Sequence, residues 1–365
     1  MNIVVVVAHG LNCHWLGPYG NEWVATPAFD SLAGESIVFD RHFATDPSAA
    51  GFTTTCLAPL CSGLRQQRVS TTLIDDRRSD SNATLGWDRV LRTDPKSFPT
   101  PGDALAATFA TALDQLPRDA PWLLWIDTDR LLPPWDFEFE TYQQYAEESG
   151  GFIEARSTEN EEPIDEPQQG SIDRDDDALW HRLHNSFAAA VTSFDAELAN
   201  LRDTLRRRGL DRTAAFIVTS SYGWPLGEHG VVGPETSALH EELIHLPLII
   251  RLPEAREAMR RVAEFTQPSD LPTAILELIR GNSSESRIGR LLLGQSTDVR
   301  ESCRIVQGDE RALRTHDWAY FAASQTKVPR LYRKPDDLWE VNDLAARHTD
   351  ECDRLLELLN AEETK

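Results

Sequence analysis

Histidine and cysteine side chains gather around the end of the first apolar run of this chain. His9, Cys13 and His14 follow that run directly, and His229 and His240 come later, at places that we expect to meet the same edge of a sheet. Imidazole nitrogens and thiolates are ligands that zinc prefers in proteins. The spacing His-x3-Cys-His is not a recognised zinc motif, however, and single histidines are more often structural residues. Catalysis at a zinc site is therefore an alternative hypothesis, and our first prediction assigns no metal.

Several segments have the pattern of buried strands separated by helices. Runs of β-branched and aliphatic residues are typical of buried parallel strands, and they occur at Ile3–Ala8, Trp122–Ile126, Phe216–Thr219 and Leu246–Arg251. From 179 to 208 apolar residues recur every three or four positions, which predicts one long amphipathic helix. Strands that alternate with helices indicate a doubly wound α/β fold, with a large and mostly parallel sheet flanked by helices.

Short pieces of sequence in a fixed order point to a known family. The pieces are Asn2–Val7, Leu16–Asn21, Thr26–Ala33, Ile37–Asp40, the loop Leu226-Gly227-Glu228-His229-Gly230, the pair Glu241-Glu242, and Leu246–Ile250. In this order they resemble the sulfatase family of the alkaline phosphatase superfamily over nearly the whole chain. The resemblance implies a large α/β domain, 1–280, and a small carboxy-terminal α+β subdomain, 281–365.

Two segments interrupt the pattern of the large domain and are predicted to be surface insertions, 77–101 and 147–177. The second is rich in acidic residues, proline and glycine and has no apolar periodicity, which predicts a solvated and mobile loop. Beyond residue 280, Ile305–Val306 and Trp318–Phe321 predict short strands, and Cys352–Leu359 predicts a closing helix.

The resemblance to sulfatases implies where a divalent cation would bind, and this chain lacks the usual ligands there. The family's aspartate pair after the first strand falls on His9 and Gly10, and its second pair of ligands falls on Ser221 and Tyr222. A serine hydroxyl and a phenol are neutral near pH 7 and cannot replace carboxylates on calcium or magnesium. We therefore expect no calcium, no magnesium and no other cofactor.

The family's nucleophile and substrate-binding positions are also changed. The resemblance places Thr53 at the nucleophile and Leu57 at an arginine position, and it places Leu132 and Pro234 where a histidine and a lysine would hold the substrate. Cys56 lacks the serine and arginine that accompany a cysteine oxidised to formylglycine, so we expect no formylglycine. A threonine hydroxyl without a metal or a base to activate it is a poor nucleophile.

These changes together predict a sulfatase-like protein without catalysis, a pseudoenzyme that binds a ligand or a partner at the vestigial site. The residues expected to line its pocket are mostly aromatic and nearly neutral: Trp15, Trp135, Trp224, Glu228 and His229. Such walls suit stacking on a sugar ring or burying an apolar anchor of a partner protein. Collapse of these side chains into the space of the metal is an equally open interpretation. Two alternatives remain: an active sulfate or phosphate ester hydrolase that uses Thr53 and a relocated metal, and a regulatory partner of an authentic sulfatase.

Composition and charge exclude other classes of partner. The 365 residues carry a formal net charge of −23, which argues against nucleic acid and anionic membranes because both are polyanions. The five cysteines are scattered and show no disulfide framework. No apolar run approaches the ~20 residues that span a bilayer. Because no signal peptide precedes the first strand, we expect a soluble cytoplasmic protein, and export stays open if a leader has been removed.

Overall fold

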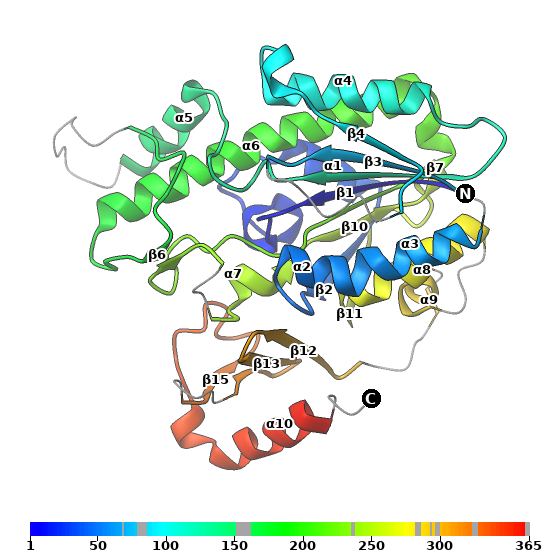
Figure 1. Ribbon diagram of the computed structural model, residues 1–365. Helices are drawn as coiled ribbons and strands as arrows, with labels where there is room; N and C mark the ends of the chain where they lie inside the picture. Colours follow the sequence, from blue (N-terminus) through cyan, green and yellow to red (C-terminus); the bar gives the residue numbers. More distant parts are fainter. Residues whose placement is uncertain are drawn as a thin grey trace.

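A large sheet between two layers of helices lies next to a smaller antiparallel sheet (Figure 1). This is a computed structural model, which describes residues 1–67, 69–78, 86–150, 162–234, 238–281, 286–292, 294–295, 300–322 and 328–361, with the backbone alone at 148–150. Of the acidic insertion predicted at 147–177, residues 151–161 lie outside the described part of the chain.

The strands of the large sheet lie in the order β11-β2-β10-β7-β1-β5-β3-β4, and β9 pairs with β2. From β7 to β4 every neighbouring pair is parallel, β11 is parallel to β2, and β10 runs antiparallel to both of its neighbours. The predicted mostly parallel α/β sheet is therefore confirmed. The strands are β1 (Asn2–Ala8), β2 (Ile37–Phe43), β3 (Ser70–Asp76), β4 (Arg89–Arg92), β5 (Trp122–Thr128), β7 (Ala214–Thr219), β9 (His245–Leu246), β10 (Leu248–Arg251) and β11 (Arg260–Thr266).

Three of the four predicted strands are confirmed as parallel strands, and the fourth differs. Pro247 separates the run Leu246–Arg251 into β9 and β10, because proline has no N–H to donate to a neighbouring strand. The apolar run of β10 is fully buried, and its burial alone does not reveal the direction of the strand.

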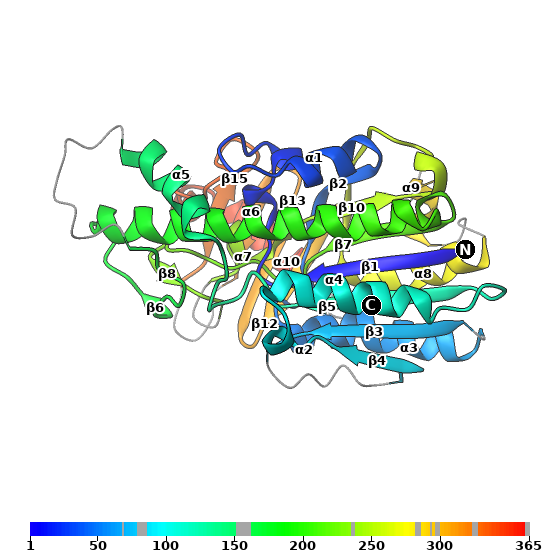
Figure 2. The ribbon, with the colours of Figure 1, turned by 90° about the horizontal axis from the view of Figure 1, so that it is seen from above.

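Successive residues of β1 point to opposite faces of the sheet, and each face has its own apolar core. Val4, Val6 and Ala8 belong to the core beneath α6, whereas the residues between them belong to the core beneath α3 and α8. Figure 2 shows α4 and α6 crossing one face of the sheet. The helices are α1 (Pro27–Gly34), α2 (Ala49–Phe52), α3 (Ala58–Arg65), α4 (Pro101–Asp114), α5 (Phe139–Gly150), α6 (Asp177–Arg207), α7 (Glu241–Ile244), α8 (Leu271–Arg280), α9 (Arg287–Leu292) and α10 (Thr349–Ala361).

The longest helix, α6, is the one predicted from 179 to 208. Its first turn is capped by Asp176, whose side chain accepts a hydrogen bond from the backbone N–H of Leu179 at 3.0 Å. It ends before Gly209, which has a φ of 68°, a conformation that favours glycine. Phe187 and Phe194 on its inner face pack into the core under the sheet.

The carboxy-terminal sheet is an antiparallel meander, β12-β13-β14-β15, covered by α10 (Figure 1). Its strands are β12 (Ser302–Gln307), β13 (Glu310–Thr315), β14 (Trp318–Phe321) and β15 (Arg330–Arg333). Leu313, Tyr320 and Leu331 pack against Leu355 and Leu359 of α10 in a small core of their own. The opposite face of the meander joins the large core, so the two sheets are held together by apolar packing.

The remaining strands, β6 (Gly170–Ser171) and β8 (Val231–Val232), form a two-stranded ribbon. None of the helices in the described part of the chain is long and apolar enough to cross a membrane.

Candidate functional site

The strand ends of β1, β5 and β7 place three polar side chains together at the expected cation position. The imidazole Nδ1 of His9 lies 2.5 Å from the hydroxyl of Ser221, and its Nε2 lies 2.7 Å from a carboxylate oxygen of Asp127. The other oxygen of Asp127 lies 3.6 Å from the guanidinium of Arg77. These four side chains therefore form one continuous polar network where sulfatase ligands were expected.

The charges of this network are balanced internally. Burial would raise the pKa of the Asp127 carboxyl, but His9 and Arg77 lower it below its usual value, so Asp127 is a carboxylate. A carboxylate only accepts, so Nε2–H of His9 donates to it and Nδ1 can accept from the Ser221 hydroxyl.

Serine, histidine and aspartate are also the groups of a nucleophilic triad, but the serine here is inaccessible. Ser221 is 0% exposed, His9 2% and Asp127 5%. A nucleophile must reach the carbon, phosphorus or sulfur atom that it attacks. The arrangement consequently fits a structural network better than a catalytic one.

Gly10, where the sequence resemblance puts the family's second aspartate, leaves no room for a side chain. Its φ is +92°, and a Cβ atom there would lie 2.6 Å from the carbonyl oxygen of Leu131. Its N–H donates to the carbonyl of Tyr222 at 2.9 Å, and its carbonyl accepts from the N–H of Trp224 at 3.0 Å. The ring of Tyr222 is stacked beside the imidazole of His9, with ring centroids 6.0 Å apart. The backbone therefore leaves no space at residue 10 for the side chain of an aspartate ligand.

Thr53 and Leu57 lie inside a continuous helical segment. The π-helical turn Thr53–Leu57 joins α2 to α3, and the Thr53 hydroxyl donates to the carbonyl of Ala49 at 2.8 Å. The amino terminus of this segment is instead capped by Ser48, whose hydroxyl accepts from the N–H of Gly51. Leu57 and Cys56 are buried, and burial raises the pKa of the Cys56 thiol.

Of the other expected substrate and pocket residues, Leu132 and Trp224 lie beside Gly10. Leu132 offers its carbonyl oxygen to the guanidinium of Arg78 at 3.1 Å, and Pro234 follows the strand β8. Trp135 is buried against Phe187, and Trp224 is 4% exposed. None of these four residues lines the cavity described next.

A cavity of about 510 Å³ lies between the turn that follows β1, the start of α6 and the carboxy-terminal part of the chain. It is lined by His14, Trp15, Asn21, Trp23, Trp180, His184, Glu228, Trp339 and Val341. Two of the predicted pocket residues, Trp15 and Glu228, therefore do face a cavity. A third, His229, is adjacent, since its Nε2 lies 3.0 Å from the carbonyl oxygen of Trp339.

The electrostatics of this cavity are close to neutral near pH 7. Burial lowers the pKa of His184 to about 4, so its imidazole is uncharged, and Nδ1–H donates to the carbonyl of Trp180 at 2.9 Å. Burial, together with the charge of Glu242, raises the pKa of Glu228 to about 7. No lysine or arginine occurs among the described residues that line the cavity.

Two further clusters could hold a metal ion, His14–Glu241–His245 and His229–His240–Glu340. Three histidines of the zinc hypothesis, His14, His229 and His240, thus occur in clusters, whereas His9 belongs to the network with Asp127. Cys13 is buried and belongs to neither cluster.

Glu241 and His245 were missed in the sequence, although their spacing of four residues is one that metal ligands on a helix use. Trp23, Trp180 and Trp339 were missed because they are far apart in the chain. Asp127 was missed because it reads as the end of a buried strand.

Comparison with known proteins identifies a family and several solved structures that this chain resembles. A family model described as Sulfatase matches residues 64–281. No curated protein matches the chain. The solved phosphonate monoester hydrolase of Agrobacterium radiobacter is similar with a TM-score of 0.77 and 18% identity, covering 99% of this chain and 95% of that one.

Two further solved structures are similar. One, determined in complex with its substrate D-glucosamine-2-N,6-O-disulfate, has a TM-score of 0.76 and 15% identity, with 100% of this chain and 97% of that chain covered. The other, a 2-O GAG sulfatase, has a TM-score of 0.74 and 13% identity, with 100% and 92% covered. At these identities the likeness shows a common fold.

Proposed function

Because the chain belongs to the sulfatase family, we propose that it is a member without sulfatase catalysis, which binds a neutral ligand in the tryptophan-lined cavity next to the turn that follows β1. The observation that carries the loss of catalysis is the backbone at Gly10. An aspartate there would need a Cβ atom 2.6 Å from the Leu131 carbonyl oxygen. A calcium or magnesium ion therefore loses a ligand that no change of side-chain rotamer can supply.

The rest of the vestigial site supports the same proposal. Both ring nitrogens of His9 are hydrogen-bonded, one to Ser221 and the other to Asp127. These side chains are therefore engaged with one another and do not offer a ligand set for a cation at that position. We propose accordingly that the protein uses no calcium and no magnesium. We also propose that Cys56 is not converted to formylglycine. Its side chain is 0% exposed, so an aldehyde at this residue could not reach a substrate.

The cavity supports binding of a neutral ligand. Trp180 (39% exposed), Trp339 (52%) and Val341 (79%) line the same cavity, and exposed apolar side chains that gather in one place mark an interaction site. Indole faces stack on the apolar face of a sugar ring or cover an apolar anchor. A sulfate group would meet no lysine or arginine among the described lining residues, and it would lie near Glu228. A neutral sugar is thus the favoured ligand, and a protein anchor the second candidate.

Calorimetry and tryptophan fluorescence with neutral oligosaccharides, sulfated oligosaccharides and free sulfate test this proposal. We expect binding of the neutral ligands only, weakened about tenfold in Trp180→Ala. Trp318→Ala in the carboxy-terminal sheet is the matched control and should bind as the parent does. An aryl-sulfate assay with and without calcium should show no turnover. Tight binding of sulfate, or calcium-dependent turnover, would refute the proposal.

A further inference from the structure

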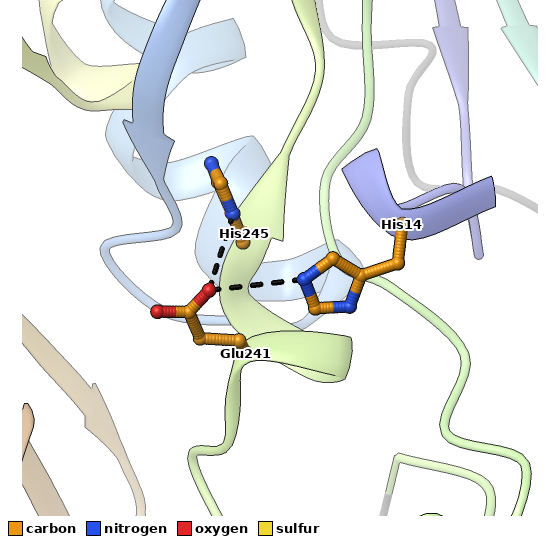
Figure 3. A group of neighbouring side chains, drawn as sticks. All are labelled: His14, Glu241 and His245. Atoms are coloured by element: carbon orange, nitrogen blue, oxygen red, sulfur yellow. Dashed lines mark ion pairs between the residues drawn. The ribbon is translucent and has the colours of Figure 1, made fainter. Parts of the chain in front are cut away.

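Three polar side chains meet between the first strand's exit turn and the short helix α7 (Figure 3). His14 comes from the turn Cys13–Trp15, Glu241 is the first residue of α7, and His245 begins β9. One ligand atom from each lies within 4.8 Å of those of the other two. All three side chains are largely buried, with exposed fractions of 13%, 3% and 15%.

The hydrogen bonding of His245 fixes which of its nitrogens faces the cluster. Nε2 lies 2.9 Å from the carbonyl oxygen of Asp40, which can only accept, so Nε2 carries the proton. In the neutral imidazole, Nδ1 is then a bare lone pair, and it lies 3.4 Å from Oε2 of Glu241. An outer N–H that donates to a backbone carbonyl is the usual support of a metal-binding histidine.

The ring of His14 also lacks hydrogen-bond partners in the described part of the chain. Neither of its ring nitrogens has a hydrogen-bond partner among the described residues. Its Nε2 lies 3.7 Å from the same oxygen of Glu241, beyond the range of a hydrogen bond. Buried polar atoms without a hydrogen-bond partner destabilise a fold. The convergence of two such imidazoles on one carboxylate oxygen therefore indicates a binding site for an ion.

Glu241 is held in place by its other oxygen. Oε1 lies 2.9 Å from the ammonium of Lys334 and 3.1 Å from Nε of Arg314. These two cations favour the charged form of the carboxyl group. The group is thus an ionised carboxylate whose Oε2 is directed at the two imidazoles.

We propose that His14, Glu241 and His245 bind a divalent transition-metal ion of the zinc class. Zinc bonds to histidine nitrogen and carboxylate oxygen are about 2.0–2.2 Å long, so two tetrahedral ligands of one ion lie roughly 3.3–3.5 Å apart. The 3.4 Å separation of His245 from Glu241 falls within that range, and the 3.7 Å separation of His14 from Glu241 exceeds it by only about 0.2 Å. Two histidines and one glutamate also form a known ligand set of zinc sites with an open fourth position. The imidazoles disfavour calcium and magnesium, which prefer oxygen.

The second cluster shows what a satisfied arrangement looks like. His229 contacts Glu242 at 2.7 Å and the Trp339 carbonyl at 3.0 Å, and His240 contacts Glu340 at 2.5 Å and Arg330 at 3.0 Å. Every ring nitrogen there has a protein partner, so that cluster needs no ion. It therefore supplies a control for the experiment.

The site meets the cavity through His14. This imidazole lines the cavity and lies edge-on to Trp339, with ring centroids 4.9 Å apart. An ion bound by His14 would thus lie near a ligand in the cavity. The metal site does not depend on the proposed function, because its three side chains would bind the ion whether or not a molecule occupies the cavity.

Zinc titration of chelator-treated protein by calorimetry, with a weak competing chelator to remove surface-bound zinc, tests the proposal. We expect one equivalent to bind, and at least about tenfold weaker binding in His14→Ala and in His245→Ala. His229→Ala should bind zinc as the parent does. Cobalt substituted for zinc should give a visible spectrum of low coordination number in the parent and lose it in both ligand variants. Circular dichroism and the melting temperature of each variant establish that it is folded.

Several results would overturn the proposal. They are failure of the parent to bind zinc or cobalt, unchanged affinity in folded His14→Ala and His245→Ala, and loss of binding in His229→Ala. The first two would leave the cluster as protonated imidazoles paired with Glu241, and the third would move the ion to the other cluster. This test uses neither the aryl-sulfate assay nor oligosaccharide binding, so a failure of the metal proposal can be distinguished from a failure of the proposed function.

Discussion

The imidazole of His9 lies 2.7 Å from the carboxylate of Asp127, at the carboxyl ends of two paired strands. Val7 is the direct partner of Asp127 in the register of β1 and β5, so His9 extends that pairing beyond the end of β1. Through Nδ1 the same ring also reaches Ser221, which follows β7. One side chain thus ties together three strand ends at the place where the family resemblance puts a cation.

Replacing His9 by alanine should destabilise the fold by about 3 kcal/mol, because Asp127 would remain buried with only the more distant Arg77 as a charged partner. Urea unfolding followed by circular dichroism measures the change. His348→Ala, at an exposed position of the carboxy-terminal part, is the control and should shift the free energy of unfolding by less than about 0.5 kcal/mol. Equal stability of the two variants would show that the network is not structural.

Gly10→Ala should cost about 2 kcal/mol or more, since the methyl group would meet the Leu131 carbonyl and the residue would keep a positive φ. Gly34→Ala is a matched control, because a Cβ there meets no atom within 4 Å and the residue ends the helix α1. It should be neutral or slightly stabilising. Thermal unfolding of both variants decides the point. A Gly10→Ala protein as stable as the parent would show that a side chain fits at residue 10, and it would contradict the argument against a metal ligand there.

Thr53→Ala should leave the protein's behaviour toward aryl sulfates and aryl phosphates unchanged, with no turnover before or after the substitution. The hydroxyl of Thr53 donates to the carbonyl of Ala49, and among the described residues no general base is hydrogen-bonded to it. A sensitive chromogenic assay with added calcium, magnesium or zinc measures this. Turnover in the parent that disappears in the variant would support the alternative of a hydrolase built on Thr53.

Intact mass spectrometry should find Cys56 unmodified. Its thiol is buried, and its raised pKa keeps it protonated near pH 7, which makes it inert to oxidation. Digestion and peptide mapping locate any change. An aldehyde mass at residue 56 would contradict the expectation.

The fold could be predicted because its signals are local. A strand such as β1 is an unbroken apolar run, and α6 carries its own period, cap and terminating glycine. The direction of β10 could not be predicted, since a fully buried strand looks alike in either direction. That His9 and Gly10 stand in place of the family's metal ligands stays a prediction, which rests on the order of the surrounding pieces.

The cavity and the metal cluster were harder to predict because their residues come from distant segments. Trp23, Trp180 and Trp339 carry no common local pattern, and only the packing of α6 and the carboxy-terminal part against the first turns brings them together. His14 was noticed, but its partners Glu241 and His245 lie more than 200 residues away. Trp135 and Trp224 were misleading because an aromatic residue near a site is as well suited to its core as to its wall.

A last prediction concerns Glu197 on α6, whose carboxylate lies 3.8 Å from Arg130 and has one oxygen without a hydrogen-bond partner among the described residues. Burial, aided by Asp76 and Asp136 and opposed by Arg130, raises its pKa to about 7. Because the folded-state pKa exceeds the unfolded value, the folded protein holds more protons between pH ~4.5 and ~7, and stability falls as pH rises through that window. Glu197→Gln removes this penalty, so at pH 8 the variant should be more stable than the parent by roughly 2 kcal/mol, and at pH 4 the two should be alike. Urea unfolding across this pH range, with the exposed Glu140→Gln as control, measures the difference. A variant no more stable than the parent at pH 8 would show that Arg130 satisfies the charge of Glu197 despite its burial.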